Sequence, residues 1–473
     1  METDTEKKAL GVSGLVAINM CIIFSVRGFP LLAEEGLSLV FYLMFSALTF
    51  LVPTALICAE LSSAWPPRGP GGVYIWSREA FGTKWAFLAV WFQWISAVVW
   101  FPTVLSFIAA TIAYIFDPSL ADNKIFILVV VLSIYWLATL ANLLGMKEVS
   151  WISTFGILSS LFITALIIFL GGLWIVEGRP VEISFTLDGF LPNLESMGNL
   201  AFLAGVMVII SGIEIAAVHT DAVKNPKRSM PLAILICTVL SCTLLLLGSL
   251  ALAIVVPQED ISLVAGLMEA FEFFLKAYHL HWLAPIIALL IVSGSIGEIT
   301  SWILGPSKGF LVSAKDGVLP PFFQKLNRNG IPINILITQA LIVTALMCVF
   351  VLMPSVNSAY WILTALNAQL YLVMYIIMFV AVIVLRHKKP DVPRNFKIGG
   401  GMIGIYFVAM VAILGGLFTL ILGFFPPSQL ETGNIWFYEL FLSLGIVVMT
   451  IIPLLIYGFR KAHWKTSDAQ GQE

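Results

Sequence analysis

Long apolar runs constrain this chain more than any other feature of its sequence. A helix needs about 20 apolar residues to cross roughly 30 Å of hydrocarbon. In lipid, only helices and closed barrels satisfy their own backbone polar groups. We therefore predict an all-α integral membrane protein with twelve transmembrane helices. The runs, numbered spans 1 to 12 in order, lie near 11–33, 37–63, 86–115, 124–144, 150–176, 197–219, 230–256, 281–306, 333–354, 358–386, 402–424 and 436–458.

The composition leaves little room for a soluble domain. Of the 473 residues 60% are hydrophobic and 11% are charged, whereas soluble domains carry about 25% charged residues. A receptor or scaffold with a sizeable soluble part is therefore not expected. The polar start of the chain does not fit a cleavable signal peptide. The five cysteines lie in apolar runs without metal-ligand spacing, so we predict no metal, cofactor or disulfide framework.

The basic residues predict the orientation. If the N-terminus is cytoplasmic, 21 of the 25 Lys and Arg residues fall in cytoplasmic segments, as the positive-inside rule expects. Three fall in outer loops, Lys124, Arg179 and Lys276, and the remaining one is Arg27. Twelve spans with both termini in the cytoplasm are therefore predicted. The segment 258–280 has helical apolar spacing and many charges, and is expected to be an amphipathic surface helix or a packed loop helix.

Arg27 lies within span 1, directly before Gly28-Phe29-Pro30. A charged side chain inside a membrane costs a few kcal/mol or more. Glycine and proline interrupt a helix, and the backbone groups they free are tolerated only where protein or a water-filled cavity receives them. A charge and a helix break at one point predict a binding site.

Span 6 has a matching weak point at 211–214, Ser-Gly-Ile-Glu. Interrupted helices at corresponding positions of two halves indicate a transporter binding site, although Gly212 alone also fits a close helix contact. Because five is an odd number of spans, the second repeat starts on the opposite side of the membrane and is therefore inverted. The prediction is a LeuT-like inverted five-plus-five architecture with broken helices 1 and 6 and two further C-terminal helices. Its segments are 1–10 as the cytoplasmic N-terminus, 11–176 and 197–386 as the repeats, 402–458 as helices 11 and 12, and 459–473 as a short cytoplasmic tail.

Four ionisable side chains lie well inside spans, namely Arg27, Glu214, His219 and Glu298, and Glu60 lies at the inner end of span 2. Arg27 cannot lose its proton. It needs a carboxylate, which Glu214, Glu298 or a substrate could supply. The alternative for Arg27 and Glu298 is a salt bridge that only fixes helix packing. His219 favours a helix-terminus role, and Glu60 favours tethering the loop that follows it.

Aromatic residues add candidates for a gate. Trp302 follows Glu298 by four residues on the same helix face, and Tyr371 and Tyr375 have the same spacing in span 10. Core packing is the alternative for all three. The predicted substrate-binding residues are Ser25, Arg27, Gly28, Phe29, Ser211, Gly212, Ile213 and Trp302. The predicted gating or proton-coupling residues are Glu214, Glu298, Tyr371 and Tyr375.

Several motifs resemble those of the amino acid–polyamine–organocation transporters, and within them the bacterial glutamate/GABA antiporters. The resemblance covers about residues 10–458. It is carried by Gly294–Gly309, Asn327–Pro332, the pair Tyr371 and Tyr375, and Glu60 with Gly71-Gly72-Val73-Tyr74. It implies amino acid exchange by alternating access in a bacterial inner membrane, with a small amino acid as substrate and lipid as the surrounding partner.

The chain also departs from that family. Where the antiporters carry Tyr-Glu-Tyr-Pro in span 1, this chain carries Arg27-Gly28-Phe29-Pro30, and Ala222 replaces an acid expected after span 6. The short tail is not expected to form the antiporters' plug. An added Arg favours a substrate with extra negative charge or a protein carboxylate that must be neutralised.

The main alternative is a proton- or sodium-coupled symporter, with Ser25, Ser293, Thr300 and Ser301 as possible sodium ligands. No nucleophile–base or metal pattern of an enzyme and no channel filter motif is visible, so neither class is expected. No nucleic-acid partner is expected, and the oligomeric state stays open.

Overall fold

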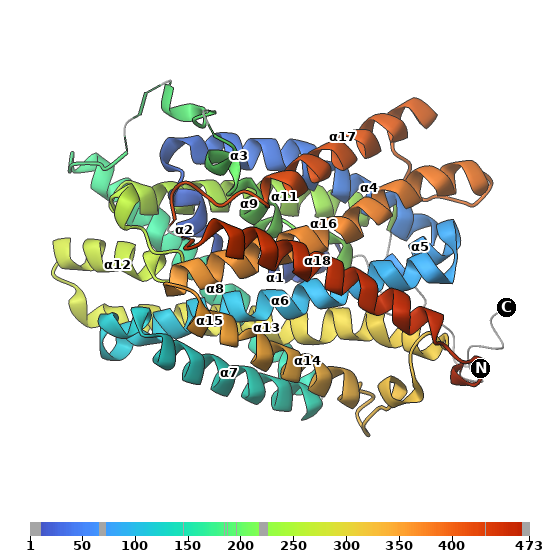
Figure 1. Cartoon of the computed structure of the whole chain (residues 1–473). Helices are drawn as coiled ribbons and strands as arrows, with labels where there is room; N and C mark the ends of the chain where they lie inside the picture. Colours follow the sequence, from blue (N-terminus) through green and yellow to red (C-terminus); the bar gives the residue numbers. More distant parts are fainter. Residues whose placement is uncertain are drawn as a thin grey trace.

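The computed structural model describes residues 11–65, 72–144, 146–183, 185–186, 188–194, 196–216, 226–430 and 432–465. Within these ranges the regular structure is helical, apart from one isolated bridge between Leu326 and Pro332. The long helices run side by side as one bundle (Figure 1). The predicted all-α class is confirmed.

Eleven helical stretches of the described chain are long and apolar enough to cross a membrane. They are Gly36–Ala64, Thr83–Phe116, Lys124–Leu144, Thr154–Val176, Met197–Ile215, Leu232–Ala253, His281–Lys315, Ile333–Leu352, Val356–Lys388, Gly401–Leu422 and Ile435–Gly458. The predicted span 1 is the remaining one. It is divided into α1 (Val12–Ile23) and α2 (Gly28–Ala33), which are each too short to cross alone.

The break in span 1 follows from its sequence. Helix α1 ends at Phe24, whose backbone is extended (φ −95°, ψ 123°), and α2 starts at Gly28. A Cβ atom added to Gly28 would lie 2.8 Å from Ile209 Cγ2. Glycine therefore allows α2 to pack closely against span 6.

Span 6 is broken at the predicted position. It consists of a short 3-10 turn (Met197–Leu200), α9 (Leu203–Ile209) and α10 (Ile213–Ala216). Gly212 lies between α9 and α10 with φ +105°, a conformation that favours glycine. Its missing Cβ leaves room for the Trp302 ring, which would be 3.0 Å away.

Three long helices form the centre of the bundle. Helix α6 (Thr83–Phe116) is almost wholly buried, and it packs against α13 (Ala284–Lys315) and α16 (Val356–Lys388). The other helices are α3 (Leu39–Ser46), α4 (Val52–Ala64), α5 (Gly72–Phe81), α7 (Lys124–Leu144), α8 (Met146–Val176), α11 (Pro226–Ala253), α12 (Gly266–Ala277), α14 (Ile333–Leu346), α15 (Cys348–Leu352), α17 (Gly401–Leu422) and α18 (Ile435–Gly458).

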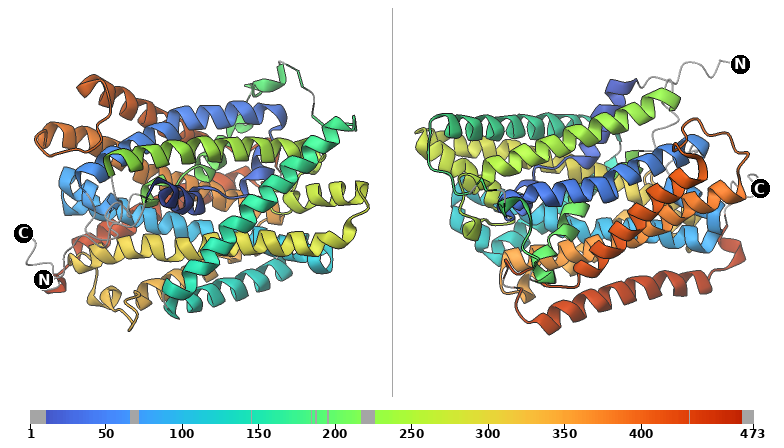
Figure 2. Two further views of the ribbon diagram at one scale, coloured as in Figure 1. Left: turned by 180° about the vertical axis from the view of Figure 1, so that it is seen from behind. Right: turned by 90° about the horizontal axis from the view of Figure 1, so that it is seen from above.

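The outer helices present apolar side chains to the surroundings. Helix α18 lies at the edge of the bundle (Figure 2, right), and only 11% of its most apolar stretch is buried. Such a surface is stable in lipid. The amphipathic helix α12 instead buries Leu267, Phe271 and Phe274 against the protein, which favours the packed loop helix over one lying in the lipid surface. The boundaries of the two repeats stay predictions.

Candidate functional site

A cavity lies where the two helix breaks face the central helices. The open space there, counted together with the adjoining solvent, is about 370 Å³. Six of the predicted site residues line it: Ser25, Arg27, Ser211, Glu298, Trp302 and Tyr371. The remaining lining residues are Ile22, Ile23, Ser96, Ala97, Trp100, Val208, Ile209 and Asn367.

The other predicted substrate-binding residues pack behind the cavity wall. Gly28 faces Ile209, and the Phe29 ring packs on Gly248 of α11. Gly212 supports the Trp302 ring, and Ile213 is buried in the core. These four residues shape the breaks, and the structure does not place them on the cavity lining.

Arg27 is buried, with only 2% of its surface exposed. Its Nη1 donates a 2.7 Å hydrogen bond to the Tyr360 hydroxyl. The guanidinium carbon lies 5.7 Å from the ring centre of Trp100 and 5.9 Å from that of Tyr360. Among the described residues Arg27 forms no ion pair, and its Nε has no hydrogen-bond partner. The predicted salt bridge that would only fix helix packing is therefore not present.

Glu298 lines the same cavity without touching Arg27. Its Oε2 accepts a 2.8 Å hydrogen bond from the Ser25 hydroxyl, which joins α13 to the break in span 1. Trp302, one turn along α13, donates a 3.4 Å hydrogen bond to the carbonyl of Ile22. It also packs against the rings of Trp100 and Tyr371. One carboxylate and one indole thus hold the end of α1.

Glu214 lies behind the cavity in a cage of neutral donors. Its Oε2 accepts a 2.5 Å hydrogen bond from Tyr375, and its Oε1 accepts bonds from Tyr371 and, at 3.2 Å, from Gln93. The Tyr375 hydroxyl in turn accepts a 2.9 Å bond from the Gly212 N–H. Three of the four predicted gating residues, Glu214, Tyr371 and Tyr375, therefore form one network around the break in span 6.

Sequence reasoning missed several residues of the site. Gln93, Trp100, Tyr360 and Asn367 lie in apolar runs of α6 and α16. A glutamine inside a transmembrane run was an available signal, because polar side chains there require partners. The aromatic residues gave no such signal, because aromatic residues that only pack in the core show the same sequence pattern.

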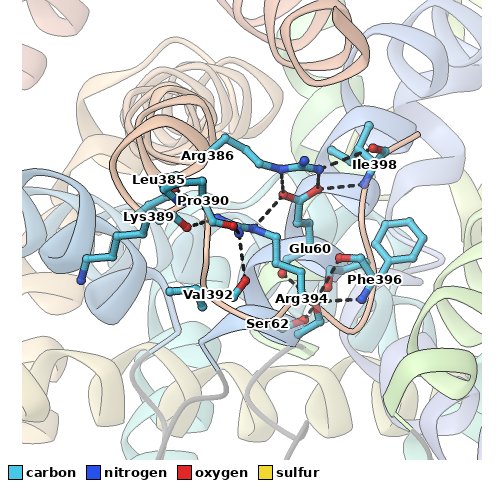
Figure 3. Close-up of polar contacts among 12 residues, drawn as sticks. Glu60, Ser62, Leu385, Arg386, Lys389, Pro390, Val392, Arg394, Phe396 and Ile398 are labelled. Atoms are coloured by element: carbon cyan, nitrogen blue, oxygen red, sulfur yellow. Dashed lines mark hydrogen bonds and ion pairs between the residues drawn. The ribbon is translucent and has the colours of Figure 1, made fainter. Parts of the chain in front are cut away.

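Glu60 is bound by basic residues at the far end of α16 (Figure 3). Arg386 donates from Nε to Oε1 at 2.5 Å and from Nη2 to Oε2 at 2.7 Å. The Ile398 N–H donates to Oε2 at 2.8 Å, and Arg394 Nε lies 3.4 Å from Oε1. Glu60 therefore holds the connection between α16 and α17. Residues 66–71 of the loop it was expected to tether lie outside the described residues.

The predictions for His219 and Ala222 also fall on residues outside the described ranges. Two acidic residues beyond the ends of the spans, Glu34 and Glu35, are buried, and a third, Glu269, is half-buried. Burial raises the pKa of Glu34 to about 8, with Glu35 and Glu269 adding to the rise. Burial likewise raises the pKa of Glu35 to about 8 and that of Glu269 to about 7.

An all-helical bundle whose two broken helices border a charged cavity is the architecture of a secondary transporter. Sequence comparison gives the same class. The chain belongs to the amino acid permease family, whose model matches residues 10–452. The predicted LeuT-like fold is thereby confirmed, and the chain is a multi-pass membrane transporter and not an enzyme.

Three bacterial relatives show how far the likeness extends. An uncharacterised transporter of Legionella pneumophila is 43% identical over 458 residues, which is 97% of each chain. A glutamate/gamma-aminobutyrate antiporter of Lactococcus lactis is 30% identical over 95% of this chain and 90% of its own. A probable agmatine/putrescine antiporter of the same species is 26% identical over 96% of each chain. The predicted resemblance to the antiporters is confirmed.

Proposed function

We propose that this protein exchanges amino acids across the bacterial inner membrane by alternating access. The supporting observation is the cavity bordered by both helix breaks. Each break is held by side chains of the long helices: Trp302 and Glu298 hold the first, and Tyr375 holds the second. A movement of either break against α13 or α16 would open the cavity toward one side of the membrane.

Antiport is favoured over ion-coupled symport. Antiporters are found among the relatives that align with nearly the whole chain. The hydroxyls considered as sodium ligands have internal partners, since Ser293 and Thr300 donate to carbonyls of α13 and Ser25 donates to Glu298.

Exchange in proteoliposomes tests the proposal. Vesicles loaded with unlabelled glutamate, GABA or glutamine are diluted into buffer with the labelled compound, with equal ions on both sides and ionophores present. An exchanger takes up label only when the vesicles hold internal substrate. Uptake that needs a sodium or proton gradient and ignores internal substrate would instead identify a symporter.

The cytoplasmic placement of both termini is part of the proposal, and labelling of single cysteines at residues 8 and 465 in right-side-out vesicles tests it.

A further inference from the structure

Among the described residues Arg27 places a positive charge in the cavity wall without a carboxylate in direct contact. The guanidinium stays protonated, and only 2% of the residue is exposed. Its hydrogen bond among the described residues goes to a neutral hydroxyl, that of Tyr360. Its Nε is buried without a partner. Glu298 attracts this charge across the cavity without contacting it. A buried charge that lacks a directly bonded anion is costly, so an anion bound to Arg27 would stabilise the site.

The two acids at and behind the cavity form their hydrogen bonds with other residues. Glu214 is bound by Tyr371, Tyr375 and Gln93. Glu298 accepts its hydrogen bond from Ser25 and lines the cavity at a separate position. Arg27 therefore differs from Arg386, whose charge is matched by Glu60 within the protein.

We infer that Arg27 receives the carboxylate of the transported substrate and makes this carrier selective for amino acids over diamines. This inference rests on the proposed amino acid exchange. The Trp100 and Tyr360 rings hold the guanidinium, and its planar donors match a carboxylate. Glu298, which lines the same cavity, is the complementary group for the substrate ammonium. Separated opposite charges in one cavity complement a zwitterion.

A diamine meets the opposite situation. Agmatine and putrescine carry cationic groups at their ends and no carboxylate. Bound in this cavity, one cation would face Arg27, and like charges placed together in a buried site are strongly unfavourable. The span 1 arginine thus separates this chain's selectivity from that named for its agmatine/putrescine relative.

The test uses the full-length protein in proteoliposomes and measures inhibition of labelled glutamate or GABA exchange. GABA and putrescine are the matched probes, because both are four-carbon chains with an ammonium at one end. At the other end GABA has a carboxylate and putrescine has a second ammonium. Wild type should bind GABA or glutamate about 30-fold or more tightly than putrescine. Arg27→Gln should remove most of that preference, and Arg27→Lys should retain part of it. Arg179→Gln, which removes an arginine of a surface ion pair with Glu177 and not one of the cavity, should leave the ratio unchanged.

The outcomes separate this inference from the proposed function. If wild type exchanges putrescine as well as GABA, or if Arg27→Gln keeps the full preference, the inference is wrong while amino acid exchange stands. Recovery of carboxylate-selective exchange in Arg27→Gln/Glu298→Gln would show that Arg27 serves as the partner of Glu298 instead, which also overturns it. If no amino acid exchanges at all, the proposed function fails and the inference with it. Should Arg27→Gln fail to fold, the wild-type ratio and Arg27→Lys still decide.

Discussion

Tyr375 joins the break in span 6 to α16 through a single hydroxyl. That hydroxyl donates a 2.5 Å hydrogen bond to the Glu214 carboxylate and accepts a 2.9 Å bond from the Gly212 N–H. A backbone N–H released by a helix break inside a membrane needs such an acceptor. Tyr375 is therefore the residue through which a movement of α16 reaches the break directly.

Replacing Tyr375 by Phe should cost more than the same change at Tyr371. Tyr375→Phe leaves the Gly212 N–H without its acceptor and removes one donor from Glu214. Tyr371→Phe removes only a donor. A buried polar group left unsatisfied costs about 1–3 kcal/mol, so Tyr375→Phe should lower the thermal unfolding temperature in detergent by several degrees and slow exchange. Equal effects of the two variants would contradict a special role for Tyr375.

Neutralising Glu60 should strongly destabilise the end of the bundle at which α16 connects to α17. Glu60 is buried and pairs with Arg386 and Arg394, whose side chains are 12% and 2% exposed. Removing one partner of a buried ion pair costs about 3–5 kcal/mol, so Glu60→Gln should markedly lower the unfolding temperature. It should also speed proteolysis of the connection between α16 and α17.

Glu79 provides the matched control for Glu60. It pairs with Lys389 in the same region, but the two side chains are 26% and 40% exposed. Exposed pairs contribute about 0–1 kcal/mol, so Glu79→Gln should leave the unfolding temperature nearly unchanged. An equally small effect of Glu60→Gln would mean that the Glu60 network adds little to stability.

Glu34 and Glu35 are expected to make the folded protein less stable as the pH rises. Burial is the main cause that raises the pKa of Glu34 and Glu35 from the ordinary 4.5 to about 8. Between these values the folded protein binds more protons than the unfolded chain, so its stability decreases as the pH rises through this interval. The unfolding temperature should fall between pH 5 and pH 8. Glu34→Gln should flatten this fall, and an unchanged slope would refute the assignment.

The sequence predicted the positions of the breaks and buried charges, but not their partners. Arg27, Glu214 and Gly212 violate the rules for a membrane helix, and such violations are visible in one sequence. Their partners were not, because Tyr360 and Tyr375 lie far along the chain among apolar residues. Helices such as α6, which are apolar on all sides, carry no periodicity that fixes which face turns inward. Glu60 illustrates this limit, since the partners that the structure describes for it lie beyond residue 385, more than 300 residues along the chain.

Gly212 should tolerate no side chain. Its φ of +105° is unfavourable for other residues, and an added Cβ would lie 3.0 Å from the Trp302 ring. Such backbone strain costs about 1–3 kcal/mol, so Gly212→Ala should lower the unfolding temperature and displace Trp302 from the cavity wall. Reduced exchange and altered tryptophan fluorescence are the expected signals.

Gly172 in α8 is the control for this substitution. It is exposed, has ordinary helical geometry, and an added Cβ would meet nothing within 4 Å. Because alanine favours a helix interior over glycine by roughly 0.5–1 kcal/mol, Gly172→Ala should leave exchange intact and slightly raise the unfolding temperature. If Gly212→Ala behaved in the same way, the break in span 6 would not depend on the left-handed backbone of residue 212, and the glycine would act only as a small contact between helices.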